Sequence, residues 1–222
     1  MKQMALQFGA SGSRRAEDFS LTKANQEAYR GVLESAWPQT YMVLTGPSGS
    51  GKTHLASIWA NARRAPMLDA KLLDEAWTMR WQQAAEPVVI DALETLEDER
   101  SLFHVLNLSK ETDTHVLVVG GEQALQSVAL LDLKSRLLGA PKAVLGQPDD
   151  ELLRILFIKH FSDRQLHISP DILQYLVNHV ERSGKAIAEI VRVLDEQALE
   201  KKQNISLAFL RKYLPATSNS VN

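Results

Sequence analysis

The residues best suited to chemistry lie in one short segment, in which Gly46 and Gly51 frame a loop that runs directly into Lys52 and Thr53. This Gly-x4-Gly-Lys-Thr spacing is typical of a loop whose backbone N–H groups surround phosphates. The lysine of such a loop reaches the β- and γ-phosphates, and the threonine hydroxyl ligates Mg²⁺. The segment therefore predicts a site for ADP or ATP with Mg²⁺. The residues predicted to hold the nucleotide are Gly46, Pro47, Ser48, Gly49, Ser50, Gly51, Lys52, Thr53 and His54.

The elements on either side of this loop are those that phosphate binding requires. Residues 41–45 form an apolar run that predicts a buried strand, and residues 53–62 carry apolar side chains at helical spacing. A helix that begins at the loop adds partial positive charge to it. A chance glycine-rich turn would not need this strand–loop–helix context, so the context favours a phosphate site.

A second expected strand, residues 88–90, ends at Asp91. A phosphate-binding loop needs an acidic residue at the end of a neighbouring strand to hold the water shell of the metal, and Asp91 is predicted to be that residue. The alternative is an aspartate that only caps the next turn. The residue after it is Ala92, where ATPases with this kind of site usually carry a second carboxylate that orients water. Because alanine cannot polarise water, we expect nucleotide binding with weak or no intrinsic ATPase activity.

The rest of the chain predicts two domains. Strands and helices alternate up to residue 146, which predicts an α/β fold with a parallel sheet covered on both faces. Beyond that point we expect only helices, over residues 149–161, 169–181, 185–203 and 206–213. The expected organisation is a flexible N-terminal tail (1–16), a nucleotide-binding domain (17–146), a small all-helical lid domain (147–215) and a disordered tail (216–222).

The composition of the chain excludes several kinds of protein and of binding site. The chain has 222 residues, 45% hydrophobic and 23% charged, as in a soluble globular protein. It has no cysteine, which excludes disulfides and thiolate metal sites. The formal net charge of −2 gives no electrostatic case for nucleic acid, and no apolar run approaches a membrane span. We therefore expect a cytoplasmic protein with no membrane partner and an indirect or weak contact with DNA.

Several stretches between residues 17 and 214 resemble the DnaA branch of the AAA+ family. Residues 46–55 resemble its phosphate loop, and the segment that ends at Asn25 resembles the approach to its adenine pocket. Residues 183–187 resemble its lid-helix segment, with Lys185 in place of the arginine that forms the second sensor. The resemblance implies a P-loop AAA+ sheet sandwiched by helices, then a helical lid, with Asn25 and Lys185 at the nucleotide.

Residues 133–137 resemble the family segment whose arginine acts as a finger on the nucleotide of the next subunit, which implies that role for Arg136. Spacing alone would indicate a solvated arginine. A finger supplied to another protein's triphosphate raises its hydrolysis rate by roughly 10³–10⁵. The DNA-binding domain of the initiator is missing after the lid. The resemblance therefore implies a negative regulator of replication initiation that stimulates hydrolysis of DnaA-bound ATP.

An apolar peptide at the N-terminus places Gln3 three residues before Leu6, with Phe8 two residues further on. This spacing resembles the hexapeptide that docks proteins on the bacterial sliding clamp, the β subunit of DNA polymerase III. Leu6 and Phe8 would fill an apolar hollow while the Gln3 amide bonds at its rim. The same peptide could instead fold back as an edge strand.

Three other interpretations stay open at this stage. A self-sufficient AAA+ ATPase such as a helicase loader would turn over ATP without partners, which Ala92 argues against. A small-molecule kinase would need an arginine-rich lid, but the lid region carries as many acidic as basic residues. The third is a nucleotide-dependent interaction module whose partner is not DnaA. Only the segments that contain Arg136 and Gln3 distinguish this interpretation from a DnaA regulator. Nucleotide preference and self-association are not determined by the sequence.

Overall fold

The computed structural model describes residues 19–213, so the predictions made for residues 1–18 and 214–222 lie outside it. Five parallel strands form one sheet in the order β2-β3-β4-β1-β5. Their bounds are β1 (Tyr41–Thr45), β2 (Met67–Asp69), β3 (Val88–Asp91), β4 (Val116–Gly120) and β5 (Lys142–Val144). The predicted α/β fold with a parallel sheet is confirmed.

Alternate side chains of the central strands enter two different cores. On β1, Val43 belongs to one buried cluster and Leu44 to the other, because successive residues of a strand point to opposite faces. All five residues of β1 are buried. This burial on both faces explains why the central strands are continuous apolar runs rather than alternating ones.

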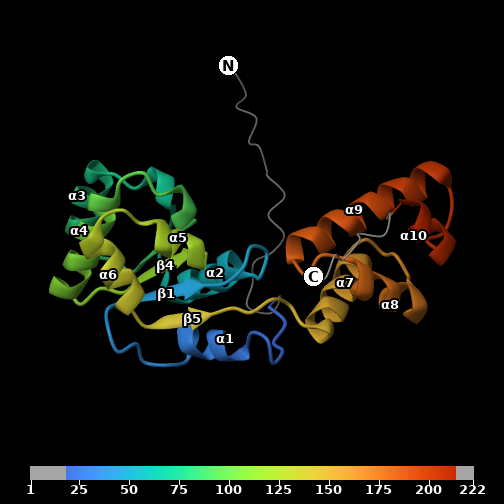
Figure 1. Cartoon of the computed structure of the whole chain (residues 1–222), viewed down its shortest axis with the longest axis horizontal. Coiled ribbons are helices and arrows are strands. Elements are labelled where there is room, and N and C mark those ends of the chain that lie inside the picture. The colour runs from blue at the N-terminus through green and yellow to red at the C-terminus, as the bar shows by residue number, and fades with distance from the viewer. Residues whose placement is uncertain (1–18, 214–222) are drawn as a thin grey trace, which may run out of the picture.

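Helices cover both faces of the sheet (Figure 1). One face packs against α1 (Gln26–Leu33) and α2 (Lys52–Arg63). The other face packs against helices that follow β2, β3 and β4, and these include a short α5 that the sequence interpretation missed. Their bounds are α3 (Glu75–Ala84), α4 (Glu99–Glu111), α5 (Glu122–Ser127) and α6 (Leu131–Gly139), with short 3-10 turns η2 (Ala70–Leu72) and η3 (Leu93–Thr95).

The C-terminal helices have a core of their own. They are α7 (Asp150–Asp163), α8 (Pro170–His179), α9 (Gly184–Lys201) and α10 (Leu207–Tyr213). Phe157 and Phe161 are fully buried there and stack with ring centroids 6.4 Å apart. Figure 1 shows these helices as a separate group beside the sheet, reached through the chain that leaves β5. We call this group the lid.

Local capping sets where the lid helices begin. The side chain of Asp149 accepts a hydrogen bond from the backbone N–H of Leu152 at the start of α7, and Ser169 and Ser183 cap α8 and α9 in the same way. Pro170 occupies the first turn of α8, where its missing N–H has no helical partner to lose. Pro148 directly precedes Asp149 and lies outside α7. No helix within residues 19–213 is long and apolar enough to cross a membrane.

Candidate functional site

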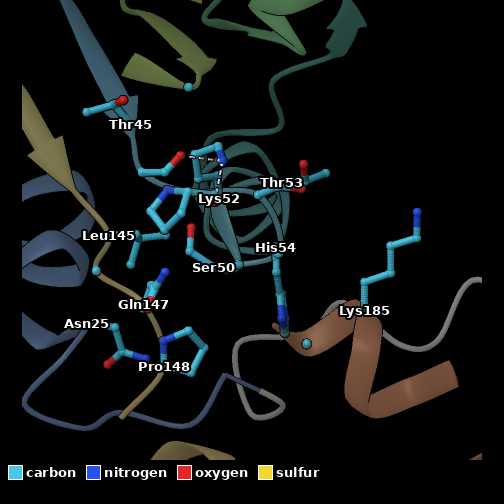
Figure 2. A pocket seen from close by; sticks show the side chains of 18 of the residues that line it. Asn25, Thr45, Ser50, Lys52, Thr53, His54, Leu145, Gln147, Pro148 and Lys185 are labelled. Atoms are coloured by element: carbon cyan, nitrogen blue, oxygen red, sulfur yellow. Dashed lines mark hydrogen bonds between the residues drawn. The ribbon is translucent and has the colours of Figure 1, made fainter. Parts of the chain in front are cut away.

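A cavity of about 1470 Å³ lies where the phosphate loop, the ends of β1 and β3 and the lid meet (Figure 2). The structure brings most of the predicted nucleotide residues onto its wall, although they are far apart in the sequence. The predicted residues that line it are Asn25, Gly46, Pro47, Ser48, Gly49, Ser50, Gly51, Lys52, Thr53, His54, Asp91 and Lys185. Arg136 does not line it, and Gln3, Leu6 and Phe8 lie outside the described residues.

The start of α2 is an uncapped helix N-terminus that faces the loop. Gly51 precedes the helix with φ of 99°, a left-handed conformation that favours glycine. No side chain caps the helix, and its first turn contains no acidic residue. Its first N–H groups and the positive end of its dipole therefore suit an anion such as a phosphate.

Lys52 lies back on its own loop. Its Nζ donates hydrogen bonds to the carbonyl oxygens of Gly46 and Pro47, each at 2.8 Å (Figure 2). Burial lowers the pKa of the Lys52 ammonium, while the nearby carboxylates of Glu94 and Asp91 oppose this effect. Among the described residues, the hydrogen bonds of this partly desolvated cation go only to neutral carbonyls, so a phosphate could still replace them with charge-assisted bonds.

Two hydroxyls on the cavity wall support the same interpretation. Thr45 at the end of β1 and Ser50 in the loop are 2% and 7% exposed. The Oγ1 atom of Thr45 and the Oγ atom of Ser50 have no hydrogen-bond partner among the described residues. Buried polar atoms usually have partners, so these two suit a ligand or water that brings hydrogen-bonding groups to the loop.

The end of β3 brings two carboxylates to the cavity rather than one. The Oδ1 atom of Asp91 accepts a hydrogen bond from the N–H of Ala92 at 2.8 Å. Ala92 has φ of 58°, so the chain turns sharply, and Glu94 also lines the cavity. Sequence reasoning stopped at Ala92 and missed Glu94. The only available signal was a glutamate three residues after Asp91.

The lid touches the phosphate loop directly. The backbone N–H of Gly184, the first residue of α9, donates a hydrogen bond to the carbonyl oxygen of Gly49 at 3.0 Å. Ser183, which caps α9, is 4% exposed and lies against Gly49. Lys185 follows in the first turn of α9 and faces the cavity from the lid side (Figure 2). The second domain thus contributes charge to the predicted nucleotide site.

Replacing Gly49 with alanine is expected to disturb this contact and weaken nucleotide binding at least about fivefold. Gly49 has φ of +72°, and an added Cβ would lie 2.4 Å from the Cβ of Ser183. A non-glycine residue in that region costs on the order of 1 kcal/mol before the clash is added. Titration with a fluorescent ADP analogue measures the effect. Gly139→Ala is the matched control, since its added Cβ meets nothing within 4 Å; equal affinities for the two variants would contradict the prediction.

Phe19 and His54 add aromatic rings to the wall of the cavity. The ring of Phe19 meets that of His54 edge-on with centroids 5.3 Å apart and stacks on Tyr29 at 5.7 Å. Asn25 lines the cavity, but its side chain is engaged locally, accepting from the N–H of Thr22 and donating to the carbonyl of Ser20. Asn25 therefore shapes the cavity wall indirectly, because its side chain holds the segment from Ser20 to Thr22 in place.

One side of α7 also lines the cavity. Leu152, Leu156 and His160 line the cavity at spacings of four residues, which places them on one helix face. Burial lowers the pKa of the His160 imidazole, and Arg164 lowers it further. The α7 side of the lining is thus apolar or neutral, whereas the phosphate loop carries the charge of Lys52, and the two together suit a ligand with an apolar ring and phosphates.

Arg136 lies on α6, away from the cavity, and packs against its own domain. Its guanidinium carbon is 4.3 Å from the centre of the Phe103 ring on α4. The Nη1 atom is buried without a hydrogen-bond partner among residues 19–213. This is not the extended position that a finger requires. Within the part of the chain that the structure describes, no ion pair holds the side chain there, and a cation–π contact contributes only about 0.5–2 kcal/mol.

Comparison with known proteins places the lid in a family. Residues 149–214 match the family described as Hda, lid domain. Over 90% of its length the chain is similar in structure to domain III of DnaA from Thermotoga maritima, with a TM-score of 0.73, 18% identity and 95% of that chain covered. The chain has the AAA+ fold of DnaA, and its lid matches the Hda lid family.

The chain also matches a second DnaA structure and a bacterial protein sequence. An AMPPCP-bound DnaA from Aquifex aeolicus aligns over 89% of the chain and 67% of its own length, with a TM-score of 0.68 and 16% identity. An uncharacterized protein of Haemophilus influenzae is 25% identical over 191 residues, covering 79% of this chain and 82% of that protein. The order of phosphate loop, sheet and lid in this chain is therefore that of the DnaA AAA+ fold.

Proposed function

We propose that this chain is a regulator of chromosome replication that binds ADP or ATP and stimulates hydrolysis of the ATP held by DnaA. Arg136 would act in trans on the DnaA-bound triphosphate and so lower the amount of the ATP form of DnaA. The observation that carries the proposal is the joining of an Hda-type lid to the P-loop cavity through the Gly184–Gly49 hydrogen bond. A known DnaA structure binds AMPPCP in the same fold.

The residues of the cavity fit Mg²⁺ together with the nucleotide. The Thr53 hydroxyl and, through water, the Asp91 carboxylate would hold the ion, since hard cations prefer oxygen ligands. When bound, Mg²⁺ would neutralise charge on the β- and γ-phosphates. Lys52 would turn from the Gly46 and Pro47 carbonyls to the phosphates, and Lys185 would approach them from the lid.

Loss of the Arg136–Phe103 contact is part of this proposal. A finger must cross to another molecule, so docking on DnaA would have to replace the ring contact with a triphosphate. The exchange is favourable because a phosphate offers the guanidinium charge-assisted hydrogen bonds, whereas in this structure its Nη1 atom has no partner within the described residues.

A direct test uses DnaA loaded with ATP, sliding clamp on DNA, and this chain. We expect conversion of DnaA-bound ATP to ADP to accelerate only when the chain is present, and to accelerate further when clamp is loaded. Unchanged conversion at saturating chain would overturn the proposed function. An ATPase that turns over free ATP rapidly without DnaA would favour the helicase-loader alternative instead.

Clamp docking is proposed through the N-terminal peptide. Changing both Gln3 and Leu6 to alanine is expected to weaken clamp binding at least about thirtyfold, because hot-spot anchors cost about 2 kcal/mol or more when truncated. Surface plasmon resonance on immobilised clamp measures the loss. Lys2→Ala is the control within the same peptide, and DnaA stimulation without clamp should be unaffected. Wild-type affinity of the double variant would contradict the assignment.

A further inference from the structure

Glu94 is fixed on the wall of the nucleotide cavity by a backbone hydrogen bond. Its Oε1 atom accepts from the N–H of Gly121 at 2.5 Å, and both residues line the cavity. Gly121 follows β4 and precedes α5, so the bond ties the turn after β3 to the end of the neighbouring strand. A Cβ on Gly121 would already lie 3.0 Å from Oε1, so the approach is close.

The turn after Asp91 places this carboxylate at the cavity. Ala92 adopts a left-handed conformation, and the 3-10 turn η3 then buries Leu93 against Gly120. The Thr95 hydroxyl donates to the Ala92 carbonyl at 2.8 Å and closes the turn. With Leu93 held inside, the Glu94 side chain lies on the cavity wall.

The position of Glu94 is suited to water next to a triphosphate. Glu94 and Asp91 are the two carboxylates that act on Lys52, and the effect of Glu94 is the larger. Lys52 is the side chain that would contact the γ-phosphate, so Glu94 lies on the γ-phosphate side of the cavity. With Oε1 engaged by Gly121, Oε2 has no hydrogen-bond partner among residues 19–213.

We propose that this chain slowly hydrolyses its own bound ATP, with Glu94 as the carboxylate that orients and deprotonates the attacking water. The inference rests on the nucleotide binding in the proposed function. The water oxygen bonds to the γ-phosphorus as the bond from that phosphorus to the β–γ bridging oxygen breaks. The water proton passes to Oε2 of Glu94 and then to the released phosphate, leaving ADP and inorganic phosphate. The chain would thereby convert itself to its ADP form.

Glu94→Gln removes the carboxylate that would accept the water proton but keeps an oxygen that can accept the hydrogen bond from the Gly121 N–H. The variant therefore tests the role in proton transfer without removing this structural contact. Each protein is saturated with [γ-³²P]ATP and Mg²⁺, and phosphate release is followed in a single turnover without DnaA. We expect slow release by the wild type above the Lys52→Ala background, and a fall of at least about tenfold in Glu94→Gln. Glu97→Gln, an exposed charge loss on the same loop, should keep the wild-type rate.

Affinity for ATP, measured in parallel by calorimetry, should differ by less than about twofold between Glu94→Gln and wild type. Equal hydrolysis rates for these two proteins, or a wild-type rate at the Lys52→Ala background, would overturn the inference. Binding of ATP without Glu94-dependent hydrolysis would overturn it alone and leave the action on DnaA standing. Failure of the wild type to bind ATP while it still binds ADP would overturn the inference alone, and failure to bind either nucleotide would overturn both proposals.

Discussion

Replacing Arg136 with alanine is expected to return hydrolysis of DnaA-bound ATP to the rate of DnaA alone while leaving nucleotide binding by this chain intact. An arginine supplied in trans accounts for about 10³–10⁵ in rate in comparable systems, so the loss should be nearly complete. Because Arg136 does not line the nucleotide cavity of its own chain, the affinity for ADP should not change. Conversion of labelled DnaA-bound ATP to ADP measures the effect.

The matched controls for Arg136 distinguish a finger from a packing residue. Arg30→Ala removes one exposed guanidinium from α1 and should leave stimulation unchanged. Arg136→Lys keeps the charge but loses the planar fork, so it should stimulate weakly. Loss of the contact with Phe103 costs at most about 2 kcal/mol, and thermal unfolding of each variant measures that cost separately. Full stimulation by Arg136→Ala would rule out the finger.

Replacing Lys52 with alanine is expected to lower the affinity for ADP and ATP by about ten- to a hundredfold. The reason is the loss of charge-assisted hydrogen bonds to phosphate, each contributing about 1.5–3 kcal/mol. The lysine is held by Gly46 and Pro47 in this structure, so removing it leaves those two carbonyls without that donor. Isothermal titration calorimetry with ADP and Mg²⁺ gives the affinity.

Lys23→Ala is the control for Lys52, because Lys23 is an exposed lysine of the same domain that does not line the cavity. Its affinity for ADP should equal that of the wild type. If Lys52→Ala bound ADP as tightly as Lys23→Ala, the cavity would not be the phosphate site. Circular dichroism of both variants checks that a loss of binding is not a loss of fold.

The sheet and the phosphate loop were predictable because each depends on local sequence. Strands buried on both faces are apolar runs, and the loop requires glycines at fixed spacing before a lysine. The lid helices begin next to the capping residues Ser169 and Ser183, which is also a local feature. The two-layer helical cover of the sheet then follows from alternating strands and helices.

Other features of the site depend on contacts between distant segments. The left-handed turn at Ala92 carries no glycine or asparagine signal, so the direction of Glu94 could not be foreseen. The bond between Gly184 and Gly49 joins two domains, and the position of Arg136 over Phe103 depends on how α4 and α6 pack. A resemblance in sequence could indicate a role for Arg136, but not where its side chain lies.

The measurement that tests the central claim most directly is the single-turnover rate of ATP hydrolysis on DnaA at saturating Arg136→Ala protein. The guanidinium is proposed to act on a triphosphate held by another molecule. The variant should therefore still dock on DnaA but should not stimulate hydrolysis. We predict that the rate stays at that of DnaA alone, and that excess variant competitively suppresses stimulation by the wild type. A rate that rises to the wild-type plateau would contradict the account.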